Sequence, residues 1–283
     1  MKKQLGKILL GIVCVGSSNI VLANVADKAF ERNQELMYNQ NRVIFGKIIT
    51  KANSKSTQIQ RVVVLQKFEE GVNKLRLHIY KSGSWSGMGV LSHREANGKV
   101  SFWIRAPSSP SPREVASEHL YEEMLGTSGW KSDVVRTPIE SHKRTVLQKG
   151  GPMIVNGKTE AGDFIKWKSV PVKELPYSHK VVWGNKANGL IIREHFFKGD
   201  ILVRTNVLEK ETNCQGKPAV WGTVSKNVLS GKSSEVKTSK VVYVKSLPNR
   251  FFLSSSMTKS PLRDAKKAIK ETGAVSCKRP SKK

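Results

Sequence analysis

The sequence is poor in residues that commonly build catalytic and metal sites. It has three cysteines and six histidines in 283 residues, and no two histidines have the spacing of a metal-binding motif. It also lacks a G-x-S-x-G nucleophile elbow, and no helix-forming stretch follows Gly87-Met88-Gly89 to make a dinucleotide site. We therefore expect no metal, no cofactor and no enzymatic activity. The acidic pair Glu122-Glu123 could serve acid–base chemistry, but a solvated helix face is the simpler explanation. A hydrolase is the weakest of three functional alternatives.

Long apolar runs are scarce, with one exception near the start. Lysines 2 and 3 precede an apolar run from Ile8 to Val15, and small residues surround Leu22 up to Ala23. This order is typical of a secretory signal peptide, and the run is too short to span a bilayer comfortably. The sequence predicts cleavage after Ala23 and export to the periplasm. A retained N-terminal anchor is the alternative.

Cysteine is almost absent from the expected exported chain. Only Cys214 and Cys277 follow the predicted cleavage site, and no histidine lies near either of them. A metal site is therefore not expected, and an even pair in an oxidising compartment favours a disulfide. Such a bond would contribute about 4 kcal/mol in the chain-entropy model.

Acidic residues are also scarce, with 22 against 49 lysines and arginines, so that the formal net charge is +27. Loss of residues 1–23 would remove three lysines and leave +24. A charge of this size attracts anionic lipid head groups, acidic polymers or nucleic acid. Because the basic residues are scattered, a solvated lysine-rich surface is the simpler explanation. The export signal argues against nucleic acid as a partner.

Alternating apolar and polar residues recur through most of the chain. In Val100–Arg105, for example, Val100, Phe102 and Ile104 share one face of the expected strand. Asn-Gly pairs and similar turn signals separate such segments. In several segments the apolar side chains fall on both faces of the expected strand. This indicates that both faces of the sheet are covered by other parts of the protein, or that one of them lines an apolar cavity. The predicted strands are 43–51, 58–68, 75–80, 85–93, 100–105, 164–168, 177–183, 190–197, 201–208, 219–224, 236–244 and 251–253.

Helices are expected at both ends of this strand region. From Val25 onward an amphipathic pattern places Ala26, Ala29, Phe30, Leu36 and Met37 on one stripe. A short C-terminal helix would begin at Ser260-Pro261 and end at Gly273. Residues 106–112 are a proline-rich loop, and 136–162 show little periodicity. We expect a mainly β (α+β) fold with one curved antiparallel sheet of about ten strands. The expected divisions are a signal peptide (1–23), the main domain (24–259) and a short helix with a basic tail (260–283).

Three segments in a fixed order carry a resemblance to a known family. The chain resembles the bacterial outer-membrane lipoprotein-sorting protein family of the LolA-like and LolB-like superfamily. The segments are a glycine-edged strand at 87–93, a tryptophan strand at 102–104 and a glycine-rich turn at 124–133, and Ser128-Gly129-Trp130 departs from the family's usual Asp-Phe. The residues that match the family motifs are Gly87, Gly89, Leu91, Trp103, Arg113, Gly126, Thr127, Trp130 and Asp133.

The resemblance implies a half-open β-barrel whose concave face is apolar and is covered by helices. It further implies a periplasmic, non-enzymatic carrier that binds a lipid or lipoprotein acyl chain, with an inner-membrane transporter as a further partner and peripheral contact with the membrane. The alternative from a different class is an envelope interaction or structural protein that binds anionic polymers or membrane surfaces through its basic charge.

Strand parity predicts which residues would line an acyl-chain cavity. In each of two strands the apolar side chains share one face, and a curled sheet turns that face inward, beneath the N-terminal helix. The alternative is that these side chains fill the space themselves. The predicted lining is Phe30, Leu36, Leu75, Leu77, Ile79, Val100, Phe102 and Ile104.

Overall fold

The computed structural model describes residues 16–52, 56–258, 260–271 and 274–280. Most of the predicted signal peptide, residues 1–15, lies outside these ranges, so the cleavage after Ala23 stays a prediction. Among the described residues, no helix is both long enough and apolar enough to cross a membrane. The helices and strands are α1 (Gly16–Tyr38), β1 (Arg42–Lys51), β2 (Thr57–Glu69), β3 (Val72–Lys81), β4 (Gly89–Arg94), β5 (Val100–Arg105), β6 (Arg113–Glu114), β7 (His142–Gln148), β8 (Met153–Val155), β9 (Lys158–Glu160), β10 (Phe164–Pro171), β11 (His179–Asn185), β12 (Ile191–Lys198), β13 (Ile201–Cys214), β14 (Lys217–Asn227), β15 (Ser233–Tyr243), α2 (Pro261–Glu271) and β16 (Val275–Lys278).

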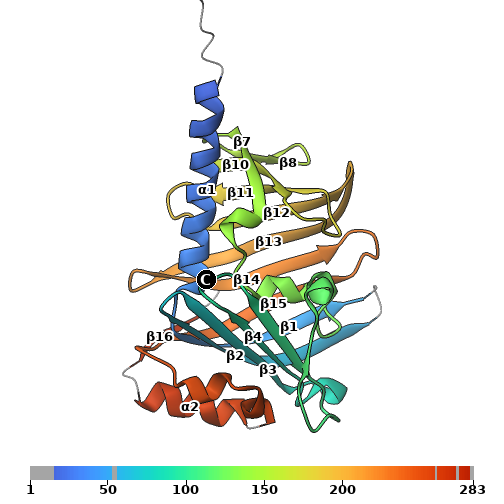
Figure 1. The fold of residues 1–283 in the computed structure, drawn as a ribbon, viewed down its shortest axis with the longest axis vertical. Helices are drawn as coiled ribbons and strands as arrows, with labels where there is room; N and C mark the ends of the chain where they lie inside the picture. The colour runs from blue at the N-terminus through green and yellow to red at the C-terminus, as the bar shows by residue number, and fades with distance from the viewer. Residues whose placement is uncertain (1–15, 53–55, 259, 272–273, 281–283) are drawn as a thin grey trace, which may run out of the picture.

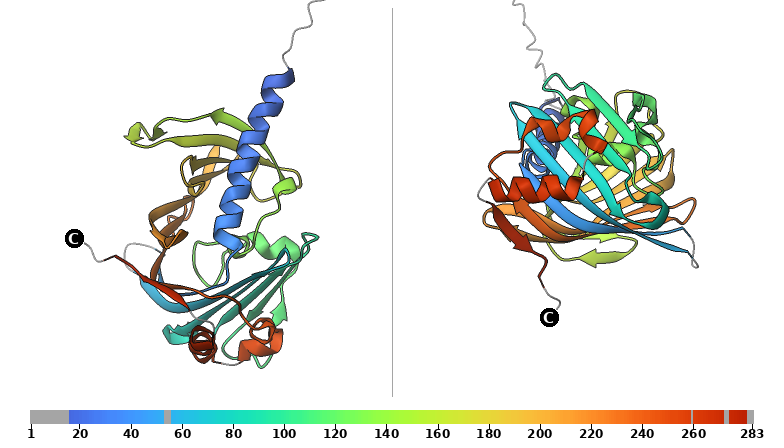
Figure 2. Two further views of the ribbon diagram at one scale, coloured as in Figure 1. Left: turned by 90° about the vertical axis from the view of Figure 1, so that its left-hand side faces the viewer. Right: turned by 90° about the horizontal axis from the view of Figure 1, so that it is seen from below.

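One large antiparallel sheet dominates the molecule. Within the described residues it has fourteen strands, thirteen of them in the order β6-β5-β4-β3-β2-β1-β15-β14-β13-β12-β11-β10-β7, with β16 paired beside β15. The sheet does not close, because β6 forms one edge and β7 the other. Its curvature makes an open trough (Figures 1 and 2). The predicted mainly β fold with a half-open barrel is confirmed.

The strand order shows two meanders that meet in the middle of the sheet. The first runs outward from β1 to the edge strand β6, and the second runs from β7 and β10 back to β15, which pairs with β1. Residues 115–141, here called the crossing segment, connect the two edges. They cross the concave face, where Gln60 Nε2 on β2 donates to the Leu125 carbonyl at 3.1 Å and the Ser128 amide donates to Ser234 Oγ on β15 at 2.9 Å.

The convex face of the first meander is covered by the C-terminal part of the chain. Val43, Val63 and Leu65 pack there against Phe252 and Ala268, the last of which lies on α2. Figure 2 shows α2 lying across these strands. Because the concave face is apolar as well, this cover explains why the strands carry apolar side chains at both parities.

Helix α1 lies over the concave face near the other edge of the sheet. Its residues Ala26 and Phe30 are buried against Ile165, Trp167 and Val182 of β10 and β11. Side chains of the first meander bind its C-terminal carbonyl groups, which lack partners within the helix. Arg42 Nη2 donates to the Met37 carbonyl at 2.6 Å, and Gln66 and Asn73 donate to the Tyr38 carbonyl at 2.8 and 2.7 Å.

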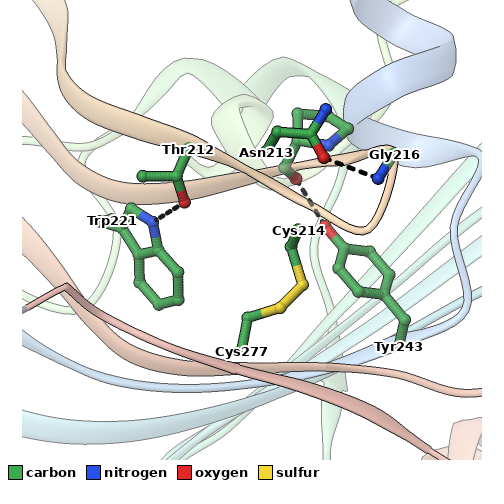
Figure 3. Close-up of a disulfide and its surroundings, with 8 residues drawn as sticks. Thr212, Asn213, Cys214, Gly216, Trp221, Tyr243 and Cys277 are labelled. Atoms are coloured by element: carbon green, nitrogen blue, oxygen red, sulfur yellow. Dashed lines mark hydrogen bonds between the residues drawn. A yellow bond between two sulfur atoms is a disulfide. The ribbon is translucent and has the colours of Figure 1, made fainter.

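The predicted disulfide between Cys214 and Cys277 is present, and it closes a split in the sheet. The first part of β15 pairs with β14, whereas its last part pairs with β16. Cys214 at the end of β13 and Cys277 on β16 are bonded across this gap, with their Cα atoms 6.2 Å apart (Figure 3). Trp221 fills the space beside the bond, and its Nε1 donates to Thr212 Oγ1 at 2.7 Å.

Several predicted elements need correction. Residues 251–253 were expected as a strand, but 249–252 form a 3-10 turn whose Phe251 and Phe252 enter the convex core. The region 136–162, expected to be irregular, contains β7, β8 and β9. Within the described residues the large sheet has fourteen strands instead of about ten. Residues 275–278 of the expected basic tail form β16 and extend the same sheet.

Candidate functional site

A cavity of about 420 Å³ lies between the concave face of the sheet, α1 and the crossing segment. Its position follows from the curvature of the sheet, because an open trough under a helix leaves space that the strand side chains alone do not fill. The apolar part of its wall comes from central strands on both sides of the β1–β15 pair. These side chains are Ile44, Ile48, Val62, Val64, Leu75, Leu77, Leu208, Val224, Val236 and Val241.

The part of the wall formed by the second meander and the crossing segment is aromatic. Trp130 stacks on Tyr177 with ring centroids 5.8 Å apart, and the Tyr121 and Phe196 rings meet both of them edge-on. The Arg204 guanidinium lies 4.2 Å above the Trp130 ring. This cluster gives the cavity an aromatic end at which π-faces and polar groups lie together, whereas the wall of the central strands is mostly aliphatic.

Cationic side chains in the cavity wall and just behind it have partners within the protein. Lys180 Nζ bonds Glu194 Oε1 at 2.7 Å, and Arg204 forms a two-pronged pair with Asp133. Burial acts to raise the pKa of Glu194, but Lys180 and the Asn206 amide hold it below its usual value. The site therefore contains charge but little unbalanced charge.

His142 stands beside this polar end and is buried. Its Nε2 lies 2.9 Å from the Tyr177 hydroxyl and its Nδ1 lies 2.7 Å from Ser141 Oγ. Burial, reinforced by Lys180 and Arg144, lowers its pKa to about 3. The imidazole is therefore neutral at ordinary pH and acts as a hydrogen-bonding group.

The pairing of Asp133 and Arg204 fixes the crossing segment over the trough. Asp133 lies in this segment and Arg204 on β13, and Asp133 Oδ2 also accepts the Trp130 amide hydrogen at 2.8 Å. Nearby, Ser128 Oγ donates to the Ser225 carbonyl on β14 at 2.7 Å. Asp133, a residue of the predicted family motif, and Ser128 thus bind the crossing segment to β13 and β14 of the second meander.

The structure brings together three of the eight predicted lining residues at the cavity wall. Phe30 approaches from α1, and Leu75 and Leu77 approach from β3. Leu36 is half-buried on α1 and does not line the cavity, whereas its neighbour Met37 does.

The other four predicted residues lie on the expected face but away from the cavity. Ile79 and Phe102 are 0% and 1% exposed, and Val100 and Ile104 pack around them. The crossing segment covers this part of the trough with Met124, Leu125 and Val135. These four side chains therefore fill space, which corrects the predicted lining.

The remaining family-motif residues serve the framework more than the cavity. Leu91 and Trp103 belong to the convex core, and Arg113 is exposed on the edge strand β6. The Gly87 carbonyl accepts a hydrogen bond from Arg105 Nη1 at 2.9 Å.

Two further glycines of the motif stand where a side chain would not fit easily. A Cβ at Gly89 would lie 3.3 Å from Met257, and one at Gly126 would meet the Trp85 ring at 3.0 Å. Gly126 also has a φ of +74°, which favours glycine. Of the motif, only Thr127, Trp130 and Asp133 reach the cavity wall.

Sequence patterns did not indicate the polar lining of the cavity. Tyr177 lies just before β11, Lys180 on β11 and Glu194 on β12, with Arg204 beside them on β13, and together they match no short sequence motif. Only the inward parity of β12, which places Glu194 beside Phe196, gives a signal for one of them. Among the described residues, His, Cys, Asp and Glu side chains form no group that could hold a metal ion.

The fold is that of the LolA-type open half-barrels, and solved structures share it over most of the chain. A structure from Vibrio parahaemolyticus described as an outer membrane lipoprotein-sorting protein domain matches with a TM-score of 0.72 and 18% identity, over 86% of this chain and 99% of its own. A DUF1329 family protein from Desulfovibrio piger matches with a TM-score of 0.72 and 15% identity, over 83% and 99%. A LolA superfamily protein from Nitrosomonas europaea matches with a TM-score of 0.62 and 19% identity, over 81% and 97%. The predicted resemblance is thereby confirmed for the fold.

A protein-family profile described as "Uncharacterized protein" matches residues 73–259, and the chain belongs to that family. The matched range includes β3 to β6 of the first meander, the crossing segment and the second meander. The curated proteins include no match to the sequence.

Proposed function

We propose that this protein is a non-enzymatic carrier that holds the acyl chain of a lipid or lipoprotein in the cavity under α1. The observation that supports this most directly is the cavity itself, about 420 Å³ in volume and walled by aliphatic side chains of the central strands. A cavity of this size is in the range of small-molecule sites. Each methylene buried there would contribute about 0.8 kcal/mol.

Phe30, Leu75 and Leu77 are the predicted residues that we expect to contact the chain. Ile79, Val100, Phe102 and Ile104 would support that wall from the side, beneath the crossing segment, and Leu36 would help to seat α1. The proposal needs no catalytic group, and the neutral His142 and the paired carboxylates fit a binding site better than an acid–base pair.

We further propose that the carrier works in the periplasm, after export by the signal peptide. The disulfide between Cys214 and Cys277 is consistent with an oxidising compartment. An inner-membrane transporter is the expected partner for loading, since a cavity under a helix needs a membrane source for its lipid.

The test is to fill the cavity without changing the surface. Val64 lines the cavity from β2, so Val64→Trp should occupy the space meant for a chain. Val170, which lies on β10 outside the cavity and is 39% exposed, gives the matched control Val170→Trp.

Binding of a fluorescent fatty-acid probe should weaken at least tenfold in Val64→Trp and stay unchanged in Val170→Trp. Equal binding by both variants, with both folded by circular dichroism, would refute the proposed site.

A further inference from the structure

The face of α1 that lies over the cavity carries two amide side chains where an apolar stripe was expected. Asn33 and Gln34 are only 8% and 7% exposed, and both line the cavity between Phe30 and Met37. Buried amides are costly unless their donors and acceptors have partners. Their presence on an otherwise apolar stripe therefore calls for a physical reason.

Within the described residues, only the carbonyl oxygen of each side-chain amide has a hydrogen-bond partner. The Ile191 amide donates to Asn33 Oδ1 at 2.9 Å, and the Thr137 amide donates to Gln34 Oε1 at 3.1 Å. Since a backbone N–H requires an acceptor, these contacts fix which side-chain atom is oxygen. The two NH₂ groups donate to none of the described residues, and so they are available to a molecule in the cavity.

The charges around the cavity argue for a neutral head group. Lys180 and Arg204 are paired with Glu194 and Asp133. Two further cations also have partners: Arg193 pairs with Glu160, outside the lining, and Arg42 donates to the Met37 carbonyl. An anionic head group would have to compete with these contacts, whereas a neutral oxygen acceptor can use the free amide hydrogens directly.

We propose that the cavity takes a single-chain amphiphile whose uncharged head, rich in ester or hydroxyl oxygens, enters beneath α1 and accepts hydrogen bonds from Asn33 and Gln34. The inference rests on the proposed carrier function and goes further, because it places the head group inside the protein. A volume of about 420 Å³ suits one chain with a small head better than several chains.

The test compares two uncharged probes that differ in acceptor oxygens. N-phenyl-1-naphthylamine has none and reports on the apolar cavity by fluorescence. 1-Lauroylglycerol, below its critical micelle concentration, competes with it and carries the expected head. Laurate in about 0.15 M salt is the anionic competitor with the same chain.

The variants are Asn33→Asp with Gln34→Glu, which keep the accepting oxygens for Ile191 and Thr137 and remove both NH₂ donors. Gln215→Glu makes the same change in an exposed turn and is the control. Asn33→Leu with Gln34→Leu is the second double variant, used if the acidic one does not fold.

In wild type, lauroylglycerol should displace the naphthylamine at lower concentration than laurate does. In the double variant its affinity should fall roughly tenfold to a hundredfold, the loss expected for two hydrogen bonds. Naphthylamine binding should stay within about twofold, and Gln215→Glu should match wild type.

Unchanged lauroylglycerol affinity in a folded double variant that still binds naphthylamine overturns this inference alone. Tighter binding of laurate than of lauroylglycerol overturns it as well. If wild type binds none of the three, the carrier function and the inference fail together.

Discussion

Buried charge in this protein is paired across elements that are distant in sequence. Arg76 on β3 meets Asp264 of α2 at 2.8 Å, and Arg144 on β7 meets Asp27 of α1 at 2.9 Å. Such pairs add little net stability, but removing one partner leaves a buried charge uncompensated. These two ion pairs therefore make the packing of α1 and α2 against the sheet sensitive to single substitutions.

We predict that Asp264→Ala lowers the free energy of unfolding by about 3–5 kcal/mol, because Arg76 would lose its buried carboxylate. The double variant Arg76→Met with Asp264→Leu should recover much of that loss, since it removes both charges. Urea denaturation measures both values. A single-variant loss below about 1 kcal/mol would show that the pair does not hold α2 in place.

We also predict that stability falls on acidification, partly because of His142. Its pKa is about 3 in the folded protein against an ordinary value of 6.5, and so the unfolded state binds the proton first as pH falls. Stability should therefore be full above about pH 6.5 and decrease towards about pH 3, by up to about 1.4 kcal/mol per pH unit from this group.

Urea denaturation between pH 7.5 and 4 checks this effect, and His142→Gln should make the pH slope shallower. His119→Gln, at an exposed histidine, is the control. Identical slopes in wild type and His142→Gln would contradict the prediction.

At the scale of elements, the crossing segment and the split in the sheet shape the site most. The crossing segment fills one end of the trough and leaves the cavity at the other. The disulfide holds β16 beside the end of β13, where β14 and β15 no longer pair. The crossing segment contacts strands of both meanders, and the disulfide joins β13 to β16, which do not pair with each other in the sheet.

Loss of the disulfide should destabilise the protein without abolishing the sheet. For a sequence separation of 63 residues, the chain-entropy model gives a loss of about 4 kcal/mol. We expect Cys214→Ser with Cys277→Ser to unfold at clearly lower urea concentration and to keep its β-sheet circular dichroism. If the variant and wild type unfold at the same concentration, the bond does not restrain the fold.

Sequence patterns predicted the strands well where side chains alternate in polarity. Val100–Arg105 was predicted with its observed bounds as β5, and the Asn156-Gly157 turn signal lies in the β8–β9 hairpin. Strand β7 was missed because its buried positions hold His142 and Arg144, which look like surface residues in a sequence. The 251–253 strand was wrong because Phe251 and Phe252 are buried by a compact turn after Pro248 instead of by a sheet.

The candidate site was less predictable than the fold. Parity identified Leu75 and Leu77, but it could not tell them from Ile79 and Phe102, since all four share one face. What separates them is the crossing segment, whose path depends on long-range contacts such as that of Asp133 with Arg204. The Asn33 and Gln34 amides were missed because an amphipathic pattern assigns polar residues to solvent.

At the scale of the whole molecule, the basic charge and the cavity suggest complementary roles. The formal charge of +24 expected after removal of residues 1–23 would concentrate the protein at anionic membrane surfaces, where the proposed lipid ligand would be found. The attraction needs no specific site.

Binding to anionic vesicles should therefore be weak and should fall steeply between about 0.05 and 0.5 M salt, because surface charges are screened over about 10 Å at 0.1 M. Vesicle sedimentation measures this, with vesicles of neutral phosphatidylcholine as the control. Equal binding to neutral and anionic vesicles would mean that charge does not direct the protein to membranes.

The most direct test of the carrier function is mass spectrometry of the organic-solvent extract of protein purified from cells without detergent. Wild type and Val170→Trp should each release about one equivalent of an acyl-chain lipid per protein, and Val64→Trp should release little. A wild-type extract free of acyl chains, or equal lipid from Val64→Trp, would contradict the central claim that the cavity under α1 holds an acyl chain.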